Sequence, residues 1–221
     1  MDAMVRATRD ERRSYADPCG VARALDAVGE RWALLVVREL SLGPLRFGGL
    51  RRGLPDMSPN VLSQRLRELE DAGVVHRYEL EPPASTTVYE LTDEGYALDP
   101  VLQALGRWGA GRPEITGRSM SAVSFLRSLR VLLAPGAPNV TYGLDVDGES
   151  FALRIAGSGA DITRGRPGAP VATLGGDVTT LRAALLARND LTALEAAGSL
   201  TITGDRRAAR RLPGLFRVPP R

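Results

Sequence analysis

Residues 47–91 of this chain read FGGLRRGLPDMSPNVLSQRLRELEDAGVVHRYELEPPASTTVYEL. A short helix is expected over 46–52, followed by a turn at GLPD. Ser58 then has the residue type of a helix N-cap, and Pro59 suits the first helical position. Gly73 supplies a C-terminal stop. The stretch therefore predicts two helices joined by a tight turn, the second ending at residue 71 or 72.

The second of these helices has two distinct faces. At about 100° per residue, Leu66 and Leu69 fall within roughly 40° of Leu62 and form a buried stripe. The opposite face carries Asn60, Gln64 and Arg67, with Ser63 near its margin. Asn and Gln can pair with adenine and Arg with guanine, while the Ser58 end points backbone N–H groups towards a phosphate. By itself, this pattern fits an ordinary solvated helix face equally well.

The residues that follow decide between these two interpretations. Residues 74–80 and 87–91 are typical of paired strands, and the polar sequence EPPASTT forms the tip between them. Helix, turn, helix and a two-stranded wing make up a device that places its second helix in the major groove of DNA. Arg77 is the wing residue best placed for a phosphate, a contact that positions a protein without reading sequence.

Helices are also expected on both sides of this stretch. Apolar residues recur at three- and four-residue steps over 20–40, which predicts one continuous helix. A second amphipathic helix is expected from Thr92 to about Gly109, and a helix in this position often packs against a second copy of the protein. The apolar residues are Val21, Leu25, Val28, Trp32, Leu35 and Val36 in the first helix, and Leu98, Val101, Leu102, Leu105 and Trp108 in the second.

Charge and composition limit the function classes. The chain has 221 residues, 43% hydrophobic, and all 29 basic residues are arginine. Residues 1–112 hold 15 Arg against 17 Asp and Glu, so DNA binding by this half must depend on a few well-placed arginines. With one cysteine, no secretion signal and no long apolar segment, the expected location is the cytoplasm, in association with the nucleoid, and no membrane partner is expected.

The second half of the chain shows a different pattern. A linker is expected over 109–118 and a helix over 119–133. Residues 140–146 and 151–155 then alternate with period two around an Asp147-Gly148 turn, which indicates a hairpin. Two strands (160–164, 171–175), two helices (177–187, 190–196), a strand (200–203) and a helix (205–212) complete the pattern. We expect an α+β fold with an antiparallel sheet covered by helices.

The first half resembles the HxlR-type bacterial transcriptional regulators over residues 19–110. The resemblance rests on the motifs GERW, RFGGL, LPDMS, VLSQRLRELEDAG and YELTDEG in this order. It implies a dimeric winged-helix protein that binds double-stranded DNA. Our angular placement puts Arg65 on the flank of the helix, which favours a phosphate contact. The expected DNA-binding residues are Arg46, Arg51, Ser58, Asn60, Ser63, Gln64, Arg65, Arg67 and Arg77.

Cys19 stands where many members of this family carry a cysteine, which in some of them senses oxidants or electrophiles. A thiol at a helix N-terminus, with Arg23 one turn later, favours the reactive thiolate. The alternative is a buried cysteine that packs at the dimer interface.

Residues 120–217 resemble the sterol-carrier-protein-like fold, through the DGE hairpin, PVATL before a helix and GSLTITGD near the end. That resemblance implies a cavity between sheet and helices for a small hydrophobic effector. The alternative is that the same residues simply fill a core, because pocket walls are also mostly apolar. The candidate lining residues are Tyr142, Leu144, Phe151, Leu153, Leu181 and Leu185.

These patterns predict a winged-helix DNA-binding and dimerisation domain over 1–112 and a sterol-carrier-like, ligand-binding domain over 113–221. The expected function is a homodimeric transcriptional regulator of a pseudo-palindromic operator, controlled by a hydrophobic ligand or by Cys19 chemistry. The alternative is a carrier of a hydrophobic metabolite whose winged helix serves only dimerisation. We expect that the protein is not an enzyme and binds no metal or cofactor, because His76 is the only histidine and no catalytic motif appears in the sequence.

Overall fold

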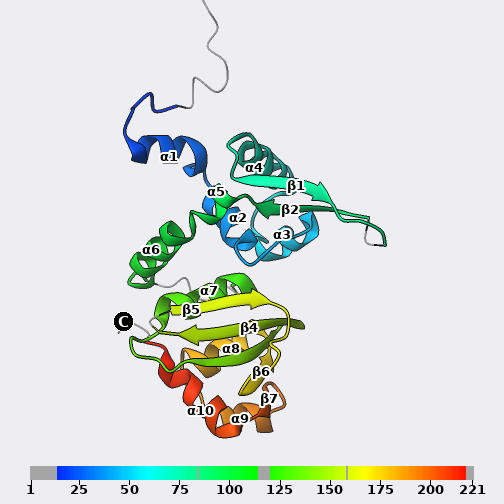
Figure 1. Cartoon of the computed structure of the whole chain (residues 1–221), viewed down its shortest axis with the longest axis vertical. Helices are drawn as coiled ribbons and strands as arrows, with labels where there is room; N and C mark the ends of the chain where they lie inside the picture. Colours follow the sequence, from blue (N-terminus) through cyan, green and yellow to red (C-terminus); the bar gives the residue numbers. More distant parts are fainter. Residues whose placement is uncertain (1–13, 84, 114–119, 158, 218–221) are drawn as a thin grey trace, which may run out of the picture.

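The computed structural model describes residues 14–83, 85–113, 120–157 and 159–217. Within these ranges the buried apolar side chains form two clusters, one in the helical first half and one around the sheet of the second half. Figure 1 shows the two parts one above the other, joined through the helices at the centre. Of the expected linker over 109–118, residues 109–110 belong to a helix and residues 114–118 lie outside the described residues, as does the N-terminal stretch 1–13.

The first half follows the order expected for a winged helix-turn-helix. Helix α4 ends at the residue predicted, and the wing strands pair with Val75 opposite Leu91. A further short bridge joins Leu45 to Tyr89. The elements are α1 (Gly20–Val28), α2 (Ala33–Leu40), α3 (Phe47–Gly53), α4 (Pro59–Asp71), β1 (Val75–Glu79), β2 (Thr87–Leu91), α5 (Asp93–Tyr96) and α6 (Asp99–Ala110).

The prediction of one continuous helix over 20–40 is wrong. Helix α1 ends at Gly29, whose N–H donates to Leu25 O, and Trp32 turns the backbone into the left-handed region with φ 80°. The break divides the apolar face that the three- and four-residue spacing had predicted to be continuous. Val28 stays in the core, whereas Val21 on α1 is 69% exposed.

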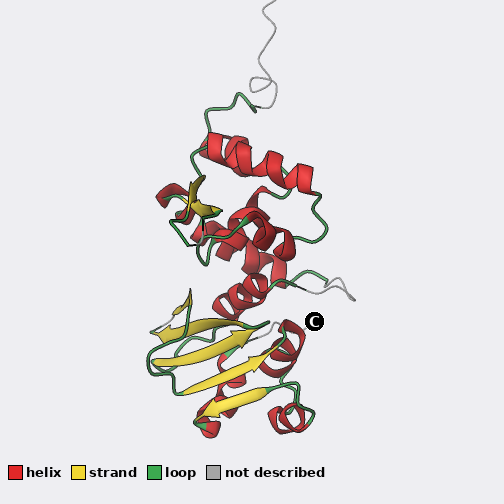
Figure 2. Cartoon of the chain, turned by 90° about the vertical axis from the view of Figure 1, so that its right-hand side faces the viewer, coloured by secondary structure: helices red, strands yellow, loops and turns green. Residues whose placement is uncertain are grey.

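The second half is a sheet with helices on one of its faces (Figure 2). The strand order is β5-β4-β3-β6-β7. The elements are α7 (Ala122–Leu132), β3 (Val140–Val146), β4 (Glu149–Ala156), β5 (Gly159–Arg164), β6 (Ala172–Gly176), α8 (Val178–Leu185), α9 (Leu191–Ala196), β7 (Thr201–Gly204), α10 (Arg206–Arg211) and a 3-10 turn, Leu212–Leu215.

The sheet is mixed, which corrects the antiparallel sheet expected from the sequence. Strands β3 and β6 run parallel, with Leu144 beside Leu174, while the other neighbouring pairs are antiparallel. Alternation of apolar residues indicates which side chains face the core, but it does not indicate whether the neighbouring strand runs parallel or antiparallel. The connection over 165–171 returns the chain to the far side of β3, where β6 enters in the same direction.

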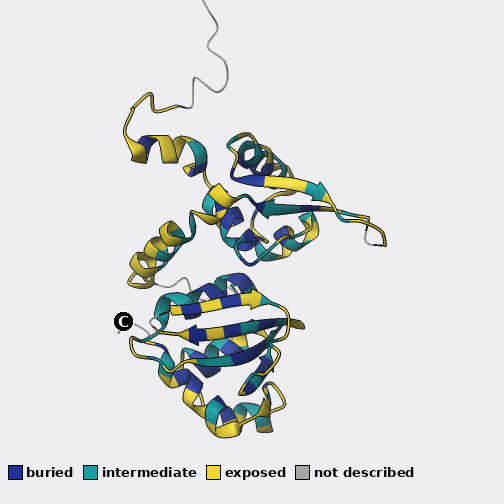
Figure 3. Ribbon diagram, in the orientation of Figure 1, coloured by how far each residue is buried: buried dark blue, intermediate teal, exposed yellow. Residues whose placement is uncertain are grey.

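The two halves meet along α7. Leu42, from the connection between α2 and α3, is buried in the cluster of the second half. Ser121, the N-cap of α7, donates its hydroxyl hydrogen to Glu39 Oε1 at 2.7 Å, and Glu39 is itself buried on α2. Gly106 of α6 lies so close to α7 that an added Cβ would stand 3.1 Å from Val131. Helix α7 thus packs on both halves (Figure 3).

Candidate nucleic-acid interface

Helix α4 is held in place by caps and by its buried stripe. Ser58 Oγ accepts from Val61 N at 3.3 Å, and Pro59 stands at the first turn, as the sequence predicted. Leu62, Leu66 and Leu69 are all buried in the cluster of the first half. One face of α4 is therefore fixed against the domain core, and the opposite face is left for contacts outside it.

That opposite face carries the residues expected from the angular placement. Asn60 and Arg67 are exposed, and Ser63 and Gln64 are half-buried. Gln64 Nε2 donates to Glu68 Oε1 at 3.0 Å, a contact that the sequence analysis missed. Its signal was the four-residue spacing of the two side chains, which places them on neighbouring turns of one helix face.

Arg65 corrects the prediction of a phosphate contact. Its side chain is 7% exposed and forms ion pairs with Glu68 of α4 and with Glu30 from the connection between α1 and α2. The two carboxylates already neutralise the guanidinium, and the side chain is not open to an incoming phosphate. Helix α4 therefore presents one exposed arginine, Arg67, instead of two.

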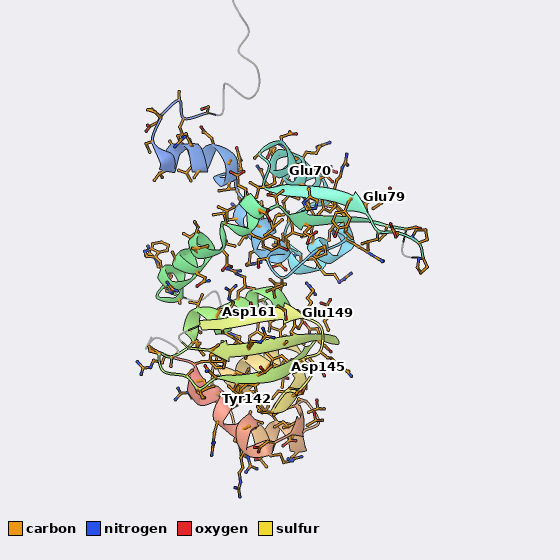
Figure 4. All side chains as sticks on the ribbon, in the orientation of Figure 1. Glu70, Glu79, Tyr142, Asp145, Glu149 and Asp161 are labelled. Carbon is orange, nitrogen blue, oxygen red and sulfur yellow. The ribbon has the colours of Figure 1, made fainter. Side chains whose placement is uncertain are left out.

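The arginines of α3 and the wing lie on the surface. Arg46 and Arg51 are exposed at the two ends of α3, and Arg52 next to them is exposed as well. Arg77 on β1 is 65% exposed and its Nε lies 3.3 Å from Glu70 Oε1. Glu70 extends from the side of α4 that faces the wing (Figure 4). A phosphate at the wing would compete with this carboxylate for Arg77.

Helix α6 exposes part of the apolar stripe that the sequence predicted, because Leu98 and Leu102 are half-buried against the core of the first half. Within the described chain none of its residues is buried, and Trp108 is 65% exposed. Arg112 lies over the Trp108 ring, 4.2 Å from its centroid. Further large apolar side chains are exposed on α1 and on α5 and α6. They are Val21, Leu25, Tyr96, Val101 and Leu105.

Cys19 is exposed and forms the N-cap of α1. Its Sγ accepts from Ala22 N at 3.4 Å, and its own N–H donates to Asp17 Oδ1 at 2.9 Å. The sulfur thus accepts a hydrogen bond from one of the free backbone N–H groups at the start of α1, and the thiol is exposed in the single chain. Burial of Cys19 against a second copy of the chain, the alternative interpretation, stays a prediction, because the structure describes one chain.

The six candidate ligand-binding residues of the second half all lie in its core. Tyr142, the most accessible of them, is 3% exposed, and its hydroxyl donates to Ala208 O at 3.1 Å. Burial raises the pKa of this hydroxyl above 10.0, and Asp205 adds to the rise while Arg211 opposes it. A surface cavity of about 330 Å³ near Arg188 and another of about 530 Å³ between α1 and α4 include none of the six.

Among the described residues, no three His, Cys, Asp or Glu side chains gather closely enough to hold a metal ion. The helices of the same ranges include none that is both long enough and apolar enough to cross a membrane.

Comparison with known proteins places the first half in a family. The model of the HxlR-like helix-turn-helix family matches residues 27–115. An uncharacterised HTH-type transcriptional regulator of Bacillus subtilis, YvaP, is 41% identical over 86 residues, which are 39% of this chain and 80% of YvaP. A second uncharacterised HTH-type transcriptional regulator, sll1512 from Synechocystis, is 36% identical to this chain over 110 residues, which are 49% of this chain and 80% of sll1512.

Among solved structures, the reduced form of the transcriptional regulator YodB from B. subtilis is 33% identical, with a TM-score of 0.39. The match covers 43% of this chain and 95% of YodB. The helix-turn-helix, its wing and the extent of the YvaP match lead to one conclusion: the chain belongs to the HxlR-like helix-turn-helix family and is a transcriptional regulator with a DNA-binding helix-turn-helix.

Proposed function

We propose that this regulator binds a pseudo-palindromic operator as a homodimer and that its second half tunes this binding in response to a small hydrophobic ligand. The observation that carries the proposal is the outward face of α4, where Asn60, Gln64 and Arg67 surround the free side of a helix anchored by its leucine stripe. Amide and guanidinium groups on the outward face of such a helix read base edges in the major groove.

The exposed apolar side chains of α1 and α6 support the homodimer. An amphipathic helix with its apolar stripe in water is stabilised when another surface covers it. Trp108, Leu105 and Val101 form such a stripe along α6. To read two adjacent operator half-sites, a dimer formed there has to hold its two α4 helices about 34 Å apart, one turn of DNA.

The distribution of charge in the first half supports a contact with DNA that is made by few residues. The first half carries more acidic than basic groups, so attraction to DNA comes from single exposed arginines such as Arg46, Arg51 and Arg77. Each phosphate neutralised by an arginine releases counterions and steepens the fall of affinity with salt. A symmetrical dimer doubles that number, and we expect a strong salt dependence.

The ligand site proposed for the second half lies between the sheet and α8. Support comes from its layered arrangement, with Leu144 and Leu153 on the sheet facing the same core as Leu181 and Leu185. Because these side chains fill the core, a ligand has to separate α8 from the sheet to enter. Such a movement reaches the first half through α7, which packs against α8, α2 and α6.

Cys19 is a second candidate control point, on the evidence of its exposure at the N-cap of α1. Oxidation of its sulfur would disturb the cap on Ala22 N, next to the exposed Val21 of the proposed dimer surface. Cys19→Ser retains an N-capping oxygen and removes the redox chemistry. If Cys19 senses oxidants, peroxide changes DNA affinity of the wild type and leaves that of the variant unchanged.

The test of the main proposal uses the purified full-length chain and its own upstream promoter region. We expect specific binding whose affinity falls steeply between low and physiological salt. Gln64→Ala should change the preferred sequence, and Arg77→Ala should weaken all sequences alike. Undetectable or salt-independent binding contradicts DNA recognition by this face, and identical behaviour of the two variants contradicts the division between reading and positioning residues.

A further inference from the structure

Three side chains on α4 and one outside it form a connected polar cluster. Glu68 Oε1 accepts from Gln64 Nε2 at 3.0 Å, and Glu68 Oε2 pairs with Arg65 Nη1. Arg65 Nη2 lies 3.5 Å from Oε2 of Glu30, in the connection between α1 and α2. The cluster thus runs from Glu30, outside α4, to the Gln64 amide on the outward face of the helix.

Arg65 fixes one end of the Glu68 carboxylate. The guanidinium is buried, and its Nε has no hydrogen-bond partner within the described residues, so the ion pairs are its main compensation. Leaving a buried charge without its partner is strongly unfavourable. Rotation of Glu68 away from Arg65 is therefore disfavoured, and Oε2 of Glu68 stays paired with the Arg65 guanidinium.

With Oε2 held by Arg65, Oε1 of Glu68 remains beside Gln64. A carboxylate can only accept hydrogen bonds, so chemistry assigns the orientation of the Gln64 amide. The NH₂ group faces Glu68 and donates one of its two hydrogens there, so the carbonyl oxygen Oε1 of Gln64 points away from Glu68. A bidentate contact to adenine, which uses the amide oxygen and one amide hydrogen, is compatible with this orientation because the second hydrogen is not used.

We propose that Glu68 is a positioning residue that orients the Gln64 amide with its oxygen, a hydrogen-bond acceptor, towards DNA, an inference that rests on the proposed reading face of α4. In the major groove, adenine N6 and cytosine N4 carry hydrogens, whereas guanine O6 and thymine O4 accept. One position in each half-site is therefore selected for adenine or cytosine on the contacted strand, against guanine or thymine.

The substitution Glu68→Gln gives this proposal a directional test. Arginine only donates, so the amide oxygen of the new side chain stays with Arg65 and its NH₂ group faces Gln64. Gln64 then accepts through Oε1 and turns its own NH₂ group outward. The preference at that position should invert towards guanine or thymine. A residue that merely supported the helix would change affinity without inverting one base preference.

The experiment selects full-length protein on duplexes with a randomised centre and sequences the bound fraction. The wild type, Glu68→Gln, Gln64→Ala and Asp71→Asn are compared. Asp71→Asn is the matched control, because it removes one negative charge from the same helix at an exposed position. Circular dichroism melts check that each variant is folded.

We expect the wild type to favour adenine or cytosine about fivefold or more at one position per half-site, as one hydrogen bond to a base edge allows. Gln64→Ala should remove that preference, Glu68→Gln should invert it, and Asp71→Asn should retain it. A wild-type preference for guanine or thymine at the position lost in Gln64→Ala overturns the proposal even if Glu68→Gln is unfolded.

Equal base preferences in Glu68→Gln and Asp71→Asn also overturn the positioning role of Glu68, while leaving DNA recognition by α4 intact. If the folded wild type enriches no sequence, the proposed reading face itself fails, and the inference about Glu68 fails with it. These results separate failure of the positioning role from failure of the reading face.

Discussion

Asp99 is the carboxylate that ties the first helix turn of α6 to α7, and its removal is the sharpest test of how the two halves are joined. Its Oδ1 accepts from Nη1 of Arg127 at 2.7 Å and of Arg130 at 3.1 Å. Its Oδ2 accepts from Arg130 Nη2 at 2.9 Å and from Gln103 Nε2 at 2.8 Å. Asp99→Ala breaks all four bonds and leaves the buried Arg127 without its carboxylate.

The expected loss of stability follows from this geometry. Removing one partner of a fully buried ion pair costs about 3–5 kcal/mol. Asp99 is 26% exposed and Arg130 is 20% exposed, so water screens part of the interaction. We therefore expect the free energy of unfolding to fall by about 2–3 kcal/mol in Asp99→Ala at neutral pH. Urea unfolding followed by circular dichroism measures this difference.

The effect should depend on pH in a defined direction. Burial alone would raise the pKa of Asp99, but hydrogen bonds from Arg127 and Gln103, with the charges of Arg127 and Arg130, outweigh it and hold the pKa below 3.8. A depressed folded-state pKa contributes stability that is present above the unfolded-state value and is lost as pH falls through the folded value. The gap between wild type and Asp99→Ala should narrow below about pH 4.

Asp93→Ala provides the matched control, because Asp93 is an exposed acid in the first turn of the neighbouring α5. It loses only the interaction with a helix N-terminus, about 0.5 kcal/mol. If Asp99→Ala lowers the free energy of unfolding no more than Asp93→Ala does, or if the loss stays constant as the pH falls below about 4, the ion pairs of Asp99 do not stabilise the junction between the two halves.

Two further predictions concern assembly and packing. If the proposed dimer packs through α6, Trp108→Glu should turn it into a monomer in analytical ultracentrifugation, because a charge in an apolar interface is costly to bury; a persistent dimer would place the interface elsewhere. Gly53→Ala should lower the free energy of unfolding by about 1–3 kcal/mol, since its Cβ would stand 2.3 Å from Glu39 Oε2. Gly48→Ala, whose nearest contact would be 3.9 Å away, should not destabilise the protein in the same urea titration, because alanine is the better helix former.

Local signals in the sequence were enough for the elements that lie next to each other in the chain. The N-cap Ser58, Pro59 and the leucine period located α4, because capping and burial of a helix face depend on residues a few positions apart. The Asp147-Gly148 pair located the β3–β4 hairpin for the same reason: both residues adopt the positive φ that such a turn requires. The sequence also determined that α6 carries an apolar stripe.

Features that depend on distant residues were decided only by the tertiary structure. The parallel pairing of β3 and β6 depends on the path of a connection, which no alternation of side chains encodes. The burial of Arg65 depends on Glu30 from another element, and the pairing of Asp99 with Arg127 joins residues on two helices.

The face of α4 shows the same division most directly. Its helical period alone determined that Gln64 points outward, because that depends on angles within one helix. The orientation of the Gln64 amide is decided by Glu68, and the position of Glu68 by the buried Arg65 and by Glu30 beyond the helix. A hydrogen-bond chain of this kind exists only when the fold brings its members together.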